Sequence, residues 1–300
     1  MLGSIGCINN NDSINKTLKN DADYQEAQNY YLGQNGYNED LNKSFNLLKK
    51  SAENGNPNAM NSLARMYLKG EATQVNNERA FYWFNKSAEF GNKEAKFNLS
   101  TFYAQGIYVD KNINKTIELY TESSNQGFSP AQYNLANAYM SGNGVDKDIN
   151  KAIELYKKAS DQGFAPAQYN LANAYMSGNG IDKDINKAIE LYKKASNQGL
   201  DAAQYNLANA YMSGNGVDKD INKAIELYKK ASDQGFDLAT YNLAVYYQNI
   251  GDIKEAEKFY IIAANNGITQ AQQNLVYLYE NDLNNPNLAK KWSSKLIKSE

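Results

Sequence analysis

Apolar residues recur along this chain at helical spacing, and the pattern returns every 36 residues. Ala131, Leu135 and Tyr139 stand at i, i+4 and i+8, and a second run from Ile149 to Ala159 has its apolar residues three and four apart. Each segment predicts an amphipathic helix with one face to bury. Helices of about 13 residues, about 20 Å long, cannot bury such a face alone. The pattern therefore predicts an all-α solenoid whose repeats stack and share a core.

Turn signals separate the two helices of each repeat. The segment SGNGV supplies Gly142 and Gly144 for a chain reversal, and Asp148 stands where an N-cap would accept a hydrogen bond from the first free amides of the second helix. Gly163 follows the second helix as a C′ residue, and Pro166 opens the next helix, where its missing N–H is harmless. Each repeat is expected to be a helix, a turn and a helix.

The same columns of residues run through about eight consecutive repeats. Residues 132–163 return at 168–199 with two changes and at 204–235 with none. The repeats at both ends are more divergent, and the seventh has a shortened turn. The expected boundaries are 24–59, 60–95, 96–131, 132–167, 168–203, 204–239, 240–271 and 272–300. Residues 1–23 are expected to form a polar, disordered tail before this array.

The repeated columns carry a signature that resembles the Sel-one-like repeat, a relative of the tetratricopeptide repeat. In one repeat the signature residues are Ala131, Leu135, Tyr139, Gly142, Gly144, Val145, Asp148, Lys151–Ala152, Tyr156, Lys158–Ala159 and Gly163. The resemblance covers 24–300 and implies a right-handed superhelix whose first helices line a concave face. It also implies a non-enzymatic adaptor that gathers other proteins, in bacteria often in signalling, envelope or host-interaction pathways. One secreted branch carries cysteine pairs that this chain lacks, so the disulfides of that branch are not implied here.

Composition narrows the possible chemistry. The chain has no histidine and a single cysteine, Cys7, which removes the commonest general base, the commonest zinc ligand and any disulfide framework. A net charge of −2 predicts neither a nucleic-acid footprint nor a polybasic membrane surface. No apolar run reaches the roughly 18 residues that would cross a bilayer. We expect no cofactor, metal or nucleic acid, and a monomer whose partners are proteins or extended peptides.

The N-terminal sequence bears on the compartment. MLGSIGCINNNDSINK lacks the basic and apolar regions of a signal peptide, so the chain as given is expected to be cytoplasmic by default. If the true N-terminus lies upstream, Cys7 becomes a candidate lipid attachment point, and a secreted, periplasmic or lipid-anchored protein is the alternative.

Two short motifs suggest other chemistry. DKDIN, residues 146–150, matches the start of a calcium loop, but Lys151 and Lys157 stand where such a loop needs Gly and Glu, so a turn capped by Asp148 is preferred. Ser13 and Lys16 form the S-x-x-K motif of penicillin-recognising enzymes, without the accompanying S-D-N or K-T-G. A cell-wall or β-lactam-type hydrolase therefore stays an alternative function.

The candidate partner-binding residues lie on the first helices. If Leu135 and Tyr139 face the core, Tyr133, Asn137 and Met140 lie on another face, where an amide can bind a peptide backbone and a tyrosine can cover an apolar side chain. The predicted contact residues are Arg65, Phe97, Thr101, Tyr133, Asn137, Met140, Tyr169, Asn173, Met176, Tyr205, Asn209, Met212 and Tyr241. Repeated surface positions without a ligand, in a pure spacer, are the remaining alternative. Specificity is expected where repeats differ.

Overall fold

The computed structural model describes residues 21–296, which form helices joined by short turns. This range holds sixteen helices and no strand, which confirms the all-α prediction. Most helices have 13 residues, the length that the apolar pattern predicted. The first begins at Ala22, and the greater part of the predicted tail, with Cys7, Ser13 and Lys16, lies outside the described residues.

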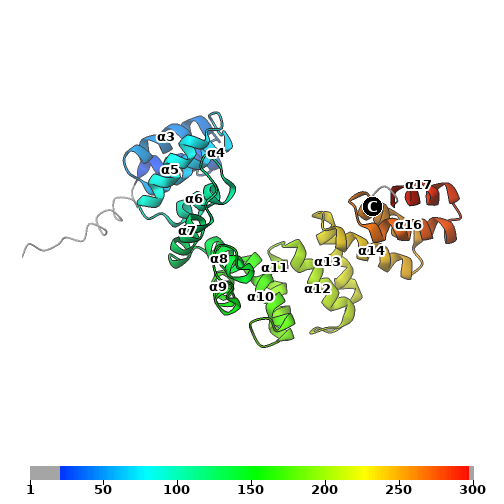
Figure 1. Cartoon of the computed structure of the whole chain (residues 1–300). Coiled ribbons are helices and arrows are strands. Elements are labelled where there is room, and N and C mark those ends of the chain that lie inside the picture. Colours follow the sequence, from blue (N-terminus) through cyan, green and yellow to red (C-terminus); the bar gives the residue numbers. More distant parts are fainter. Residues whose placement is uncertain (1–20, 297–300) are drawn as a thin grey trace, which may run out of the picture. The chain divides into compact units, whose positions relative to one another are not determined.

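The chain divides into two compact halves, Met1–Asp148 and Ile149–Glu300. The N-terminal half contains α2 (Ala22–Leu32), α3 (Leu41–Glu53), α4 (Pro57–Lys69), α5 (Asn77–Glu89), α6 (Lys93–Gln105), α7 (Ile113–Asn125) and α8 (Ser129–Ser141) (Figure 1). The C-terminal half contains α9 (Ile149–Asp161), α10 (Ala165–Ser177), α11 (Ile185–Asn197), α12 (Asp201–Ser213), α13 (Ile221–Asp233), α14 (Asp237–Asn249), α15 (Ile253–Asn265), α16 (Thr269–Asn281) and α17 (Pro286–Leu296).

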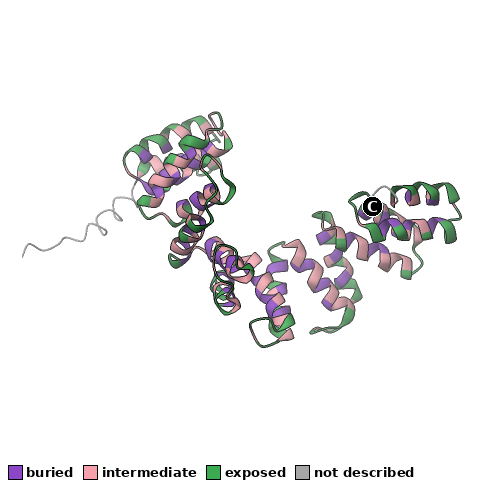
Figure 2. Ribbon diagram, in the orientation of Figure 1, coloured by how far each residue is buried: buried purple, intermediate pink, exposed green. Residues whose placement is uncertain are grey.

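Within each half, every helix packs against the next one along the chain, as α10 does on α11 and α11 on α12. Buried positions lie on the faces where helices meet (Figure 2). In the C-terminal half, Ala188 and Ala203 are fully buried and let the helices approach, while Tyr192 and Leu207 fill the space between them. Burying one such leucine stabilises the fold by about 1.5–3 kcal/mol. The stacked hairpins therefore share a core, as the repeat pattern predicted.

The predicted turn chemistry is confirmed in the exact copies of the repeat. Asp220 caps α13, because its carboxylate accepts a hydrogen bond from the backbone N–H of Lys223 at 3.0 Å. Gly214 ends α12 in the left-handed conformation, with φ 76°. Gly216 has φ 75°, and a Cβ there would lie 2.5 Å from Cγ2 of Ile185 on the preceding second helix. The second glycine of the turn is therefore required for backbone conformation and for space.

One column expected in the core is less buried than predicted. Tyr139, Tyr175 and Tyr211 are half-buried beside the turn between the two helices. The Nζ atoms of Lys187 and Lys223 each lie 5.4 Å from the ring centroid of the tyrosine in their own repeat. A lysine on the second helix covers the rings of Tyr175 and Tyr211. This column therefore forms the edge of the core and not its centre.

The helices begin slightly before the expected repeat boundaries. The repeat expected at 168–203 has its first helix starting at Ala165. The last repeat, although shorter, still forms a complete helix pair, α16 and α17. None of the helices between residues 21 and 296 has the length and apolar character needed to cross a membrane.

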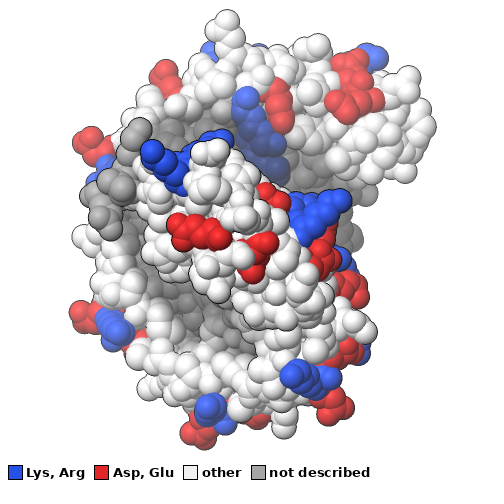
Figure 3. Space-filling model, turned by 90° about the vertical axis from the view of Figure 1, so that its right-hand side faces the viewer, with Lys and Arg blue, Asp and Glu red and all other residues white. Residues whose placement is uncertain are grey.

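Charged side chains are distributed in small mixed groups. On the face shown in Figure 3, Lys and Arg side chains lie next to Asp and Glu side chains, separated by uncharged surface. Many are ion pairs along one helix, such as Lys194 with Glu190 at 2.7 Å. Exposed pairs of this kind add little to stability because water and salt screen them, so they support helices more than they mark a site.

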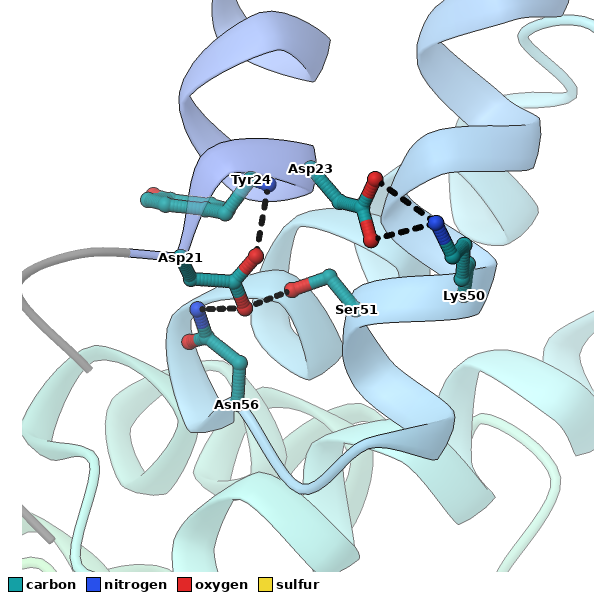
Figure 4. Close-up of polar contacts among 6 residues, drawn as sticks. All are labelled: Asp21, Asp23, Tyr24, Lys50, Ser51 and Asn56. Carbon is teal, nitrogen blue, oxygen red and sulfur yellow. Dashed lines mark hydrogen bonds and ion pairs between the residues drawn. The ribbon is translucent and has the colours of Figure 1, made fainter. Parts of the chain in front are cut away.

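Helix α2 is held to its neighbours through Asp21 (Figure 4). The Asp21 carboxylate accepts hydrogen bonds from the backbone N–H of Tyr24 at 3.0 Å, from Oγ of Ser51 at 2.6 Å and from Nδ2 of Asn56 at 2.9 Å. Burial opposes ionisation of Asp21, but these hydrogen bonds together hold the pKa of its carboxyl below the usual value. One side chain therefore links α2 to Ser51 at the end of α3 and to Asn56, the N-cap of α4.

Candidate functional site

In the C-terminal half, one of the predicted contact asparagines belongs to a hydrogen-bond network. The hydroxyl of Tyr192, on α11, donates to Oδ1 of Asn173, on α10. Asn206, on α12, reaches both groups, with its Nδ2 3.3 Å from Oδ1 of Asn173 and 3.2 Å from the hydroxyl of Tyr192. The network joins two successive first helices through the second helix between them.

The same network recurs one repeat later. The hydroxyl of Tyr228 donates to Oδ1 of Asn209, and Nδ2 of Asn242 lies 3.4 Å from that oxygen and 3.3 Å from the hydroxyl. In the diverged repeat that follows, only part of the pattern remains, because Asn274 donates to the Tyr260 hydroxyl at 2.9 Å. In both full networks, the tyrosine and the asparagine that accepts from it lie in near-identical repeats.

The tyrosine hydroxyls of this network remain protonated donors at neutral pH. Burial raises the pKa of Tyr192 and of Tyr260 to about 12. Burial also raises the pKa of Tyr228. Because a protonated hydroxyl can donate, the side-chain oxygens of Asn173 and Asn209 are hydrogen-bonded inside the protein at neutral pH.

The side-chain nitrogens of these two asparagines, unlike their oxygens, are not used in the network. In residues 21–296, Nδ2 of Asn173 and Nδ2 of Asn209 have no hydrogen-bond acceptor. The donors around each oxygen fix which end of the amide is which. Both side chains thus present two N–H donors each, in an orientation set by the core, and can serve an incoming acceptor such as a carbonyl oxygen.

Apolar and aromatic groups surround these donors. A pocket of about 240 Å³ is lined by Met176, Asn209 and Tyr192 together with Asn206, Ala210, Ser213 and Asn215. The rings of Tyr169 and Tyr205 lie 6.0 Å from those of the buried Tyr192 and Tyr228. Tyr169 and Tyr205 are therefore held in place by the core tyrosines and remain half-buried.

The predicted contact residues are not all equally placed. Arg65 is exposed, and the other twelve, from Phe97 to Tyr241, are half-buried. Met176 and Asn209 come together in one pocket, whereas Arg65 lines a separate pocket of the N-terminal half. Phe97 packs on Tyr120 with ring centroids 5.9 Å apart. The remaining residues of the set are Thr101, Tyr133, Asn137, Met140, Tyr169, Asn173, Tyr205, Met212 and Tyr241.

The sequence reasoning missed the asparagines that complete the network. Their column comprises Asn98, Asn134, Asn170, Asn206, Asn242 and Asn274. It recurs as regularly as the predicted column, and an uncharged amide repeated beside a core leucine is itself a signal of a buried polar network.

Within the described range, no three His, Cys, Asp or Glu side chains are grouped as metal ligands would be.

Comparison with known proteins places these observations in a family. The sequence model of the Sel1 repeat matches residues 21–56, 57–92, 93–128, 129–164, 165–200, 201–236 and 237–268. No curated protein matches the sequence. Proteins built from this repeat are generally scaffolds for protein interaction.

Two solved structures are similar over most of this chain. A protective antigen present in uropathogenic Escherichia coli strains, displaying an SLR fold, is 25% identical with a TM-score of 0.78, and the match covers 96% of this chain and 63% of that one. The chain thus spans less than two thirds of the length of that antigen. A Sel1 repeat protein from Oxalobacter formigenes is 25% identical with a TM-score of 0.70, over 80% of this chain and 96% of the other. With seven matched repeats and this fold, the chain belongs to the Sel1 repeat family.

Proposed function

We propose that the protein is a non-enzymatic scaffold that binds extended segments of partner proteins along the first helices of its repeats. The observation that carries the proposal is the pair of side-chain nitrogens of Asn173 and Asn209, which have no acceptor among the described residues and occupy equivalent positions one repeat apart. In the sequence, Asn137 occupies the same position one repeat earlier. Donors held at fixed spacing suit a ligand that offers acceptors at fixed spacing, as a peptide backbone does.

The spacing of the donors indicates how a segment would be read. The first helices α10 and α12 are in direct contact through Asn173 and Asn206, and helices in contact pack about 8–10 Å apart. An extended chain advances about 3.3 Å per residue, so successive asparagines would meet backbone carbonyls about three residues apart. A polyproline II segment has three residues per turn and would present the same side to each repeat.

The surrounding side chains add apolar contact without requiring movement. Met176 lines the pocket next to Asn209, and methionine adapts to side chains of different shape. Tyr169 and Tyr205 are fixed against core tyrosines, so they lose little freedom on binding. Weak contacts of this kind add along an extended ligand, because the stacked helices hold them in register.

Photo-crosslinking tests whether this surface meets a partner. A photoreactive amino acid is placed at Met212, on a first helix, or at the exposed Lys193, on a second helix, and the protein is irradiated in lysate of its own organism. We expect a specific adduct from position 212 and none from position 193. Equal adducts from both positions, or none from either, would favour a spacer without a binding surface.

The role of the amide donors is tested by a double substitution, Asn173→Asp with Asn209→Asp. Aspartate keeps an oxygen that can accept from the tyrosine hydroxyl but replaces the N–H donors. Affinity for the crosslinked partner is expected to fall about tenfold or more while the unfolding transition stays in place. Retention of affinity to within about twofold would contradict the proposal, since that is less than one ordinary hydrogen bond.

A further inference from the structure

A pocket of about 360 Å³ lies between α2 and α4, where the asparagine and tyrosine network is missing. Ser62 stands in the column that holds Asn206 in the later repeat, and Leu48 stands in the column of Tyr192. Asn61 stands where the first helices from the third to the seventh repeat carry Phe or Tyr. Because shorter side chains replace an amide, a phenol and a ring, the space between these helices remains open. The pocket therefore belongs to repeats that differ from the near-identical copies.

The pocket contains two opposite charges that are not neutralised within the described part of the chain. Arg65 is exposed and has neither an ion pair nor a hydrogen-bond partner among residues 21–296. Glu94 accepts one hydrogen bond, from Nδ2 of Asn61 at 3.3 Å, and has no cation within ion-pair distance in the same range. Glu71 differs, because the Tyr31 hydroxyl and Lys69 bind it at 3.0 and 3.2 Å. One cation and one anion thus line the pocket, and neither forms an ion pair in the described range.

Both charges act on the same aromatic side chain. Burial raises the pKa of Tyr24 and a hydrogen bond with Ser62 lowers it, while the smaller effects of Glu94 and Arg65 raise and lower it respectively. Two apolar side chains, Leu48 and Met66, also line the pocket, and each is only 1% exposed. Tyrosine rings, two apolar side chains and two opposite charges suit a ligand with aliphatic stems that end in opposite charges.

We propose that this pocket binds an extended peptide segment with one acidic and one basic side chain two residues apart, the carboxylate on Arg65 and the cation on Glu94. The inference rests on the proposed function, since it names a segment that the scaffold would hold. Arg65 lies four residues, or about 6 Å, along α4 from Asn61, which binds Glu94. In an extended peptide, side chains two residues apart lie on one side at about 6.6–7 Å. A free α-amino acid holds its charges much closer together.

The full chain offers a direct probe of Arg65, because it contains only two arginines. The other, Arg79, lies over the ring of Tyr67 at 5.7 Å, which distinguishes its environment. Blocked pentapeptide Ala-Lys-Ala-Glu-Ala is titrated while the arginine Nε–H signals are followed by NMR, with Arg65→Gln assigning the signals. We expect a saturable shift of the Arg65 signal and a constant Arg79 signal. No saturable shift at millimolar peptide would overturn the proposal.

Variants and altered probes test the pairing of charges. Arg65→Gln and Glu94→Gln are each expected to weaken peptide binding, measured by calorimetry, about fivefold, the upper range for exposed ion pairs. Glu53→Gln, an exposed glutamate of the same half, should leave binding unchanged. The blocked hexapeptide Ala-Lys-Ala-Ala-Glu-Ala places its charges on opposite sides and should bind more weakly.

Three results would contradict the inference. These are equal binding by wild type and both pocket variants, equal binding of the two peptides, and equally tight binding of free lysine, which would indicate an amino-acid site. None of them bears on Asn173 and Asn209, which lie in the other half and are tested by their own variants. The two proposals can therefore fail independently.

Discussion

The side-chain oxygen of Asn173 accepts a hydrogen bond from the buried hydroxyl of Tyr192, which lies 19 residues further along the chain. This contact makes a surface residue part of the core. The oxygen is bound internally and the nitrogen is not, so the same amide stabilises the repeat and presents donors outward. Stability and binding can be separated at this residue only by a substitution that changes one end of the amide.

The Tyr192 hydroxyl should contribute measurably to stability. Tyr192→Phe removes the hydroxyl that donates to Asn173 and accepts from Asn206. We therefore expect the free energy of unfolding to fall by about 1–2 kcal/mol. Urea titration at neutral pH measures it. Tyr82→Phe is the matched control, because Tyr82 is 52% exposed, and its effect should stay within about 0.5 kcal/mol. Equal effects of the two substitutions would remove the case for a buried network.

Alanine substitution at two glycines of the C-terminal half should distinguish the cost of backbone strain from the cost of a steric clash. Gly216 and Gly235 both have positive φ, but a Cβ at 216 would meet Ile185, whereas a Cβ at 235 would have nothing within 4 Å. Gly235→Ala should cost about 1 kcal/mol, from backbone strain alone. Gly216→Ala should cost about 2–4 kcal/mol in the same urea titration, because a tightly packed core must also shift. If the order were reversed, the close packing of this turn on the preceding second helix would be in doubt.

Substitution by methionine should destabilise the fold at one buried glutamine, Gln168, and have little effect at another, Gln272. Gln168 accepts a hydrogen bond from Gln198 at 2.9 Å and donates to the backbone oxygen of Ser160 at 3.4 Å. Gln272 occupies the equivalent position in the last repeat, and its Oε1 is buried without a partner in the described chain.

We therefore expect Gln168→Met to lower the free energy of unfolding by about 1–3 kcal/mol, and Gln272→Met to change it by less than about 1 kcal/mol. In Gln272→Met the lost donor is offset by removal of an unsatisfied oxygen. Differential scanning calorimetry of the two variants provides the comparison. A larger loss from Gln272→Met would show that its oxygen has a partner in solution.

Asp21 should make stability depend on pH in the acid range. Its pKa is lowered in the folded protein, so its contribution is present above the unfolded value of about 3.9 and is lost as the pH falls through the folded pKa. Asp21→Asn should cost about 1–2 kcal/mol at pH 7, because a charged cap with three donors is weakened.

The difference between wild type and Asp21→Asn should shrink as the pH falls below about 4. Urea unfolding at pH 7, 5 and 3 measures this difference, and Asp23→Asn, whose partner Lys50 is exposed, serves as the control. A difference that stays constant across this range would mean that hydrogen-bond geometry and not charge accounts for the effect.

Much of the fold could be predicted because its signals are local. Apolar residues three and four apart indicated the helices, Gly214 and Gly216 the turn, and Asp220 the cap of the following helix. Each of these features depends on residues within one repeat, so 36-residue recurrence tests it several times over. The half-buried Tyr175 was less predictable, since its cover comes from Lys187 on the next helix.

The candidate site was predictable only as a list of positions. The sequence indicated the columns of Asn173 and Tyr169 but not that their side chains contact Tyr192. It also drew attention to diverged residues such as Arg65 without showing a pocket there. The pocket depends on the joint absence of three larger side chains from two hairpins, and no single column reveals such a combination.

The sequence by itself determined the helices, their turns and their order, because backbone hydrogen bonding and apolar periodicity act over a few residues. Only the tertiary structure decided which atoms of the repeated polar residues remain available. Asn206 meets Asn173 across 33 residues, and that meeting leaves Asn173 with a bound oxygen and an open nitrogen. The physical reason is that an amide has two different ends, and neighbours far away in the chain determine which end is engaged.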